Sequence, residues 1–92
     1  MEITFSKSGA SWISEFQVSG AFNLHIEGVY EGDVRIYQRG TSTGAYSYVK
    51  GSTPSPSAGN VYDSDFSALV YPKYIKVVCN TKPTMAVVTT NA

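Results

Sequence analysis

QVSGAFNLHIEGVYEGDVRIYQR, residues 17–39, decides the fold class of this chain. Apolar and polar residues alternate along it, pause at a glycine-flanked break over residues 28–32, and then alternate again. Strict alternation is typical of a β-strand with one buried face, because successive side chains point to opposite sides of a sheet. The stretch therefore predicts two half-buried strands joined by a short turn, the central hairpin of a sandwich. The residues predicted to face its core are Phe22, Leu24, Ile26, Val34 and Ile36.

The rest of the chain carries the same kind of signal, and no long run has the apolar spacing of a helix. About seven short strands follow one another at intervals of 8–12 residues, which is typical of a β-sandwich or small barrel. We therefore expect an all-β protein, a single antiparallel β-sandwich of immunoglobulin-like or jelly-roll-like type, with residues 1–92 as one domain. Outside the opening stretch, strands are predicted near residues 2–5, 46–49, 61–66, 74–79 and 85–89, the last two joined as a hairpin.

Charge and cysteine content narrow the classes of function. Seven basic and seven acidic residues give a formal net charge of zero, whereas nucleic-acid binding usually requires a basic surplus. We therefore expect no nucleic-acid partner, and no apolar run is long enough to predict a membrane span. The single cysteine, Cys79, lies in an apolar run and is predicted to be buried. The chain starts without a signal-peptide pattern, so synthesis and folding in a reducing cytosol are expected.

Catalytic and metal-binding patterns are weak. A Ser-His-Asp arrangement is conceivable with His25 and Asp63 or Asp65, but His25 falls on the outward phase of its strand and no Gly-x-Ser-x-Gly motif is present. Acidic residues near the central turn (Glu27, Glu31, Asp33) and the Asp63–Asp65 pair are conceivable acid–base groups or calcium ligands. We interpret them as solvated acids, and expect no catalytic residue, cofactor or metal site, and no enzyme activity.

Aromatic residues are the stronger functional signal, at 13% of the chain. Tyrosine buries a large area while keeping a polar hydroxyl, and it is enriched at protein interfaces. Stacking on sugars and capping of the core edges are the alternative roles for these rings. The candidate interface residues are Trp12, Tyr30, Tyr37, Tyr46 and Tyr48.

The opening stretch also resembles a pattern found in small virion proteins of tailed bacteriophages. The matching residues are Val18, Gly20, Phe22, Leu24, Ile26, Gly28, Tyr30, Gly32, Val34, Ile36 and Arg39. Two positions depart from that pattern, because Tyr30 stands where tryptophan is frequent and Lys82-Pro83 where the last turn often has glycine.

The resemblance implies a β-sandwich component of a phage particle, synthesised in the host cytoplasm and found in the virion. A capsid decoration (cement) protein is the first expectation; a head–tail connector component or a carbohydrate- or receptor-binding module of a tail fibre is the alternative. The implied partner is the major capsid protein or another virion protein, together with further copies of the chain as a dimer or trimer. Residues 1–8 are a candidate segment for strand exchange between such copies.

Overall fold

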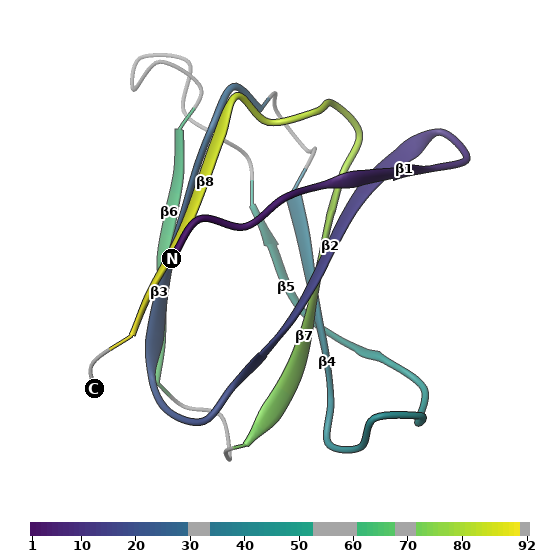
Figure 1. The fold of residues 1–92 in the computed structure, drawn as a ribbon, viewed down its shortest axis with the longest axis vertical. Helices are drawn as coiled ribbons and strands as arrows, with labels where there is room; N and C mark the ends of the chain where they lie inside the picture. Colours follow the sequence, from purple (N-terminus) through teal and green to yellow (C-terminus); the bar gives the residue numbers. More distant parts are fainter. Residues whose placement is uncertain (30–33, 53–60, 68–71, 91–92) are drawn as a thin grey trace.

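The computed structural model describes residues 1–29, 34–52, 61–67 and 72–90. These residues form two antiparallel β-sheets packed face to face, with no helix among them (Figure 1). The larger sheet has the order β1-β2-β7-β4-β5 and the smaller sheet the order β6-β3-β8. The prediction of an all-β antiparallel sandwich is confirmed, with eight strands described against about seven expected. The strands are β1 (Ser6–Ser8), β2 (Ser11–Val18), β3 (Phe22–Glu27), β4 (Val34–Arg39), β5 (Ser47–Ser52), β6 (Val61–Phe66), β7 (Lys73–Cys79) and β8 (Met85–Thr90).

The hydrophobic core fills the space between the two sheets. All five apolar residues predicted from the opening stretch lie in it, each at most 3% exposed. From the larger sheet, Ile75, Val77 and Cys79 add side chains that are 0% exposed, which confirms the buried position of the cysteine. Burial of one such aliphatic side chain contributes about 1.5–3 kcal/mol. The alternation in the sequence therefore identifies the residues that hold the two layers together.

The predicted hairpins are wrong. β3 lies in the smaller sheet and β4 in the larger one, so the break after β3 is a crossing between layers. The same is true of β7 and β8, the predicted C-terminal hairpin. Alternation reports only which side chains are buried, and the inner faces of both sheets share one core. A turn within a sheet and a crossing between sheets therefore leave the same pattern in the sequence.

The crossing after β3 needs a specific backbone conformation. Gly28 has a φ of 84°, in the left-handed region that glycine adopts with little strain. Next to it, the backbone nitrogen of Thr84 donates a hydrogen bond of 2.9 Å to the carbonyl of Glu27. The connection from β7 to β8 is thus held directly against the end of β3.

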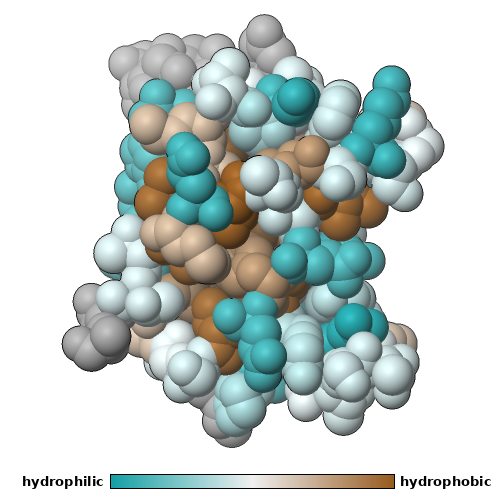
Figure 2. Space-filling view, in the orientation of Figure 1, coloured by the Kyte–Doolittle hydropathy of each residue, from teal (hydrophilic) through white to brown (hydrophobic). Residues whose placement is uncertain are grey.

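The N-terminal segment crosses between the two layers. Its first three residues pair with β8 of the smaller sheet through a bridge between Glu2 and Val87, and β1 then pairs with β2 of the larger sheet. The first strand is therefore residues 6–8, and the strand predicted at residues 2–5 is present only as an isolated bridge to β8. Ile3 and Phe5 are instead partly buried against the core, in the region where Figure 2 shows apolar side chains between the layers.

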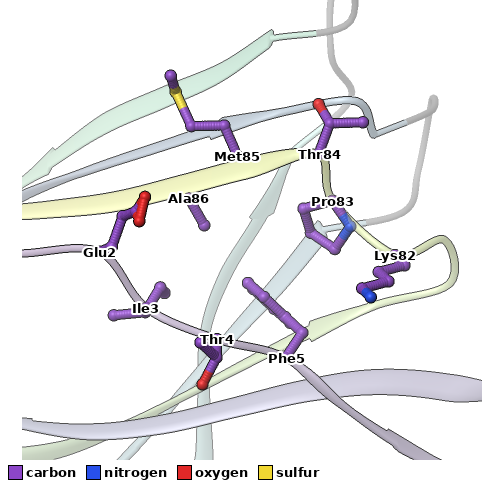
Figure 3. Close-up of a pocket in the computed structure, with 9 residues that line it drawn as sticks. All are labelled: Glu2, Ile3, Thr4, Phe5, Lys82, Pro83, Thr84, Met85 and Ala86. Atoms are coloured by element: carbon purple, nitrogen blue, oxygen red, sulfur yellow. The ribbon is translucent and has the colours of Figure 1, made fainter.

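A pocket of about 250 Å³ lies between this segment and the β7–β8 connection. Figure 3 shows Phe5 on one side of this space and Pro83 on the other. The pocket is lined mainly by short or apolar side chains, with Glu2 and Lys82 among the lining residues. The pocket shows that side chains do not completely fill the space between the N-terminal segment and the β7–β8 connection.

Candidate interaction surface

The outer surface of the larger sheet gathers tyrosines and cations from neighbouring strands. On β4, Tyr37 and Arg39 point outward because Val34 and Ile36 point into the core. The register then sets Tyr37 opposite Lys76 of β7 and Tyr48 of β5, and Arg39 opposite Tyr74 of β7. We call this surface the tyrosine face; it consists of Tyr37, Arg39, Tyr46, Tyr48, Tyr74 and Lys76.

Tyr46 is the most firmly held ring of the tyrosine face. The guanidinium carbon of Arg39 lies 4.3 Å from its ring centroid and the ammonium nitrogen of Lys76 lies 4.6 Å from it. Its hydroxyl donates a 2.7 Å hydrogen bond to a carboxylate oxygen of Glu15 on β2. Burial, and then the hydrogen bond to Glu15, raise the pKa of Tyr46 to about 12. The ring therefore stays protonated at neutral pH and ties the segment before β5 to the middle of the sheet.

Tyr37 and Tyr48 form a second aromatic contact on the same face. Their ring centroids are 5.6 Å apart at 71°, an edge-to-face arrangement that aromatic pairs favour. Lys76 lies 5.1 Å from the Tyr37 centroid, so its ammonium group is shared between two rings. Tyr48 is 59% exposed, one of the most exposed large apolar side chains described. Most of the Tyr48 ring is therefore open to solvent, while its contact with Tyr37 holds it on the sheet.

The structure brings together three of the five predicted interface residues, Tyr37, Tyr46 and Tyr48. Trp12 lies elsewhere: on β2 it pairs with the buried Cys79, and the Lys82 ammonium lies 5.3 Å from its ring. Tyr30 lies outside the described residues.

Sequence reasoning missed Tyr74, Lys76 and Arg39 as members of this face. Tyr74 and Lys76 flank the buried Ile75, so the alternation in β7 could have placed both of them on the outer side. Their nearness to Tyr46 depends on strand register, for which the sequence carries no comparable signal.

The outer surface of the smaller sheet is polar and acidic. The two ring nitrogens of His25 lie 2.7 Å from an Asp63 oxygen and 2.8 Å from a Glu27 oxygen. The amide nitrogen of Asn23 donates to Asp63 at 2.7 Å and to Asp65 at 2.9 Å. We call the surface formed by His25, Glu27, Asp63 and Asp65 the acidic face.

The two carboxylate partners of His25 affect whether it could act in the Ser-His-Asp arrangement considered from the sequence. The hydrogen bond with Glu27, and then that with Asp63, raise the pKa of His25, because a protonated ring can donate to both carboxylates. Since both ring nitrogens already face carboxylates, neither is positioned to take a proton from a serine hydroxyl. The geometry makes His25 a bridge between two acids.

The bridge predicts a pH-dependent contribution to stability. A raised pKa for His25 means that its contribution is fully present below its ordinary value of 6.5 and is lost as the pH rises through the folded-state value. The pKa of Asp63 is lowered by Asn23 and then His25, so its contribution is present above its ordinary 3.8 and is lost in stronger acid. Urea unfolding should therefore show that the wild type is more stable than His25→Gln between pH 3.8 and pH 6.5. This difference in stability should shrink as the pH rises towards about 9. An advantage unchanged at about pH 9 would contradict the bridge.

Within residues 1–29, 34–52, 61–67 and 72–90, no group of three or more histidine, cysteine, aspartate and glutamate side chains is arranged to hold a metal ion. The same residues contain no helix long and apolar enough to span a membrane. No family model, curated protein or solved structure matches this chain. Function is therefore inferred from the two sheet surfaces and from the resemblance of the opening stretch.

Proposed function

We propose that this chain is a non-enzymatic structural component of a phage particle, of the capsid-decoration type, that contacts other virion subunits through its tyrosine face. The observation that carries this proposal is the arrangement of that face. Its rings come from three segments of a continuous sheet, and two of its cations lie against ring surfaces. Aromatic and arginine side chains held in place in this way are typical of the energetically dominant residues of protein interfaces.

The role of a decoration protein follows from linkage. A protein that binds only the assembled shell stabilises that shell by mass action, without any catalytic group. A rigid two-sheet sandwich suits this role, because a preorganised surface loses little conformational entropy on binding. The opening stretch that resembles phage virion proteins supplies part of the core behind the tyrosine face, through Val34 and Ile36.

Replacing Tyr48 by alanine tests the surface. Purified chain should co-sediment with shells assembled from its partner major capsid protein, and should raise their melting temperature. Tyr48→Ala should weaken this binding by about fivefold or more, the effect of losing an exposed interface ring worth over 1 kcal/mol.

Met85→Ala is the matched control, because Met85 is 43% exposed on the smaller sheet and so lies away from the tyrosine face. Equal losses from Tyr48→Ala and Met85→Ala would reject the tyrosine face as the contact surface. Absence of the chain from purified particles would reject the virion role itself. Saturable binding to glycans that Tyr48→Ala removes, without binding to shells, would support the tail-fibre alternative instead.

A further inference from the structure

The two sheets carry opposite charges, although the whole chain has a formal net charge of zero. The strands of the smaller sheet contain three carboxylates and one histidine, and no lysine or arginine. The larger sheet is dominated by cations, with a single carboxylate among the described charged residues of its strands. Those residues are Lys7, Glu15, Arg35, Arg39, Lys73 and Lys76.

The outward-facing members of these two sets lie on opposite sides of the sandwich: Arg35, Arg39, Lys76 and Glu15 on the larger sheet, and Glu27, Asp63 and Asp65 on the smaller one. The acidic face is the outer surface of one layer and the tyrosine face is the outer surface of the other, with the apolar core between them (Figure 1). Figure 2, in the same orientation, shows hydrophilic side chains on both flanks of the central apolar region. The outward-facing charges described on the strands therefore differ in sign between the two sides of the sandwich. A net charge of zero for the whole sequence conceals this difference.

Each of the two faces also presents an exposed apolar side chain beside its charges. Tyr48 occupies this position on the tyrosine face. On the smaller sheet, Met85 is 43% exposed and pairs in register with Glu27 of the acidic face. Charge sets the orientation and speed of an encounter, while burial of apolar side chains stabilises the resulting contact. Both requirements are present on both faces.

We propose that copies of this chain associate head to tail, with the tyrosine face of one copy docked on the acidic face of the next. A second copy is the occupant that satisfies both faces at once, because each molecule presents both members of the complementary pair. An acidic polymer such as single-stranded nucleic acid would match the cations but would leave the acidic face without a complement. Such a heterologous contact uses two different surfaces, so it produces a ring if the rotation closes and an open chain if it does not.

This inference rests on the proposed function only in taking the tyrosine face as a surface that contacts protein. It concerns the isolated chain and needs no shell, so the two proposals fail separately. Loss of shell binding with intact self-association would overturn the proposed function alone. Shell binding by a chain that remains monomeric would overturn the head-to-tail contact alone.

Sedimentation equilibrium of face-specific variants tests the contact. The basic-side variant is Arg35→Gln/Lys76→Gln and the acidic-side variant is Asp63→Asn/Asp65→Asn; each removes two charges from one outer surface. The wild type should exceed the monomer mass of 9.9 kDa as its concentration rises at low salt, and should return towards it at about 0.5 M salt. Each variant alone should associate about tenfold more weakly than the wild type.

The decisive sample is an equimolar mixture of the two variants. Each retains the face that the other lacks, so the mixture should form a heterodimer and stop at two copies. Lys7→Gln/Lys82→Gln is the matched control, because it removes two positive charges away from the tyrosine face and should associate as the wild type does. Circular dichroism establishes that every variant is folded.

Three outcomes would overturn the proposal: a wild type that stays monomeric up to about 1 mM at low salt, a mixture that does not form heterodimers, or a control that loses association as the face variants do. Tight binding of the wild type to a labelled oligothymidylate, without self-association, would assign the cations to nucleic acid and would equally overturn the head-to-tail contact.

Discussion

Replacing Gly28 by alanine should lower the free energy of unfolding by about 3 kcal/mol or more, by combining backbone strain with a steric clash. Gly28 has a φ of 84°, and a β-carbon there would lie 2.6 Å from the Thr84 hydroxyl and 2.9 Å from the Thr84 backbone nitrogen. The side chain of Thr84 could rotate away, but its nitrogen is fixed by the hydrogen bond to Glu27. Either that bond or the crossing between layers must therefore shift.

Two other glycines separate these effects. Gly9 has a φ of 62°, and a β-carbon added there would have nothing within 4 Å, so Gly9→Ala should show the strain alone, about 1 kcal/mol. Gly20 has neither a positive φ nor a close neighbour, so Gly20→Ala should be neutral or slightly stabilising. Urea unfolding of the three variants measures the series. Equal losses at Gly28 and Gly9 would show that the contact with Thr84 is unimportant.

The sequence is sufficient to predict the class of fold and much of the core, for a physical reason. Burial alternates along β3 and along the first residues of β4, so the sequence alone shows that Leu24 and Ile36 face the core, whichever strands lie beside them. Pairing between strands leaves no such local trace. The segment after Ile26 is therefore predictable as a break, while its passage from one sheet to the other is not.

The tyrosine face is predictable in part for the same reason. Tyr37 and Tyr48 fall on outward phases of their strands, and this is sufficient to select them. Tyr46 belongs to the face because its ring reaches Arg39, Lys76 and Glu15 across three strands. Such a contact depends on register and on the order β2-β7-β4-β5, both set by long-range packing.

Net charge is the least informative property of the sequence. The net charge is a sum over the chain, and it does not record where each charge lies in the folded protein. A net charge of zero therefore excludes charged partners only if positive and negative side chains are mixed on every surface. The folded chain distributes its lysines and arginines mainly to one sheet and leaves carboxylates on the other. The charge of each surface is therefore a better guide to the class of partner than the total charge.

The largest expected effect is at Phe22, where the two layers meet near one end of the sandwich. The Phe22 ring stacks on that of Phe66 in the same sheet, with centroids 4.7 Å apart and planes 5° from parallel. It also meets Phe16 of the larger sheet edge to face, at 5.9 Å and 90°. Phe22→Ala should cost about 3–5 kcal/mol, since it removes buried apolar surface and leaves a cavity. Against a total stability of about 5–15 kcal/mol, this loss would leave a marginal protein.

Phe22→Leu provides the control, because it keeps most of the apolar volume while removing the ring. It should cost about 1–2 kcal/mol, and it remains measurable if the alanine variant does not fold. A double-mutant cycle of Phe22→Leu with Phe66→Leu should give a coupling of about 0.5–1.5 kcal/mol for the stacked pair. A coupling near zero would show that Phe22 acts through its volume alone. A loss from Phe22→Ala below about 1 kcal/mol would mean that this aromatic group does not join the layers, because the cavity would have closed without cost.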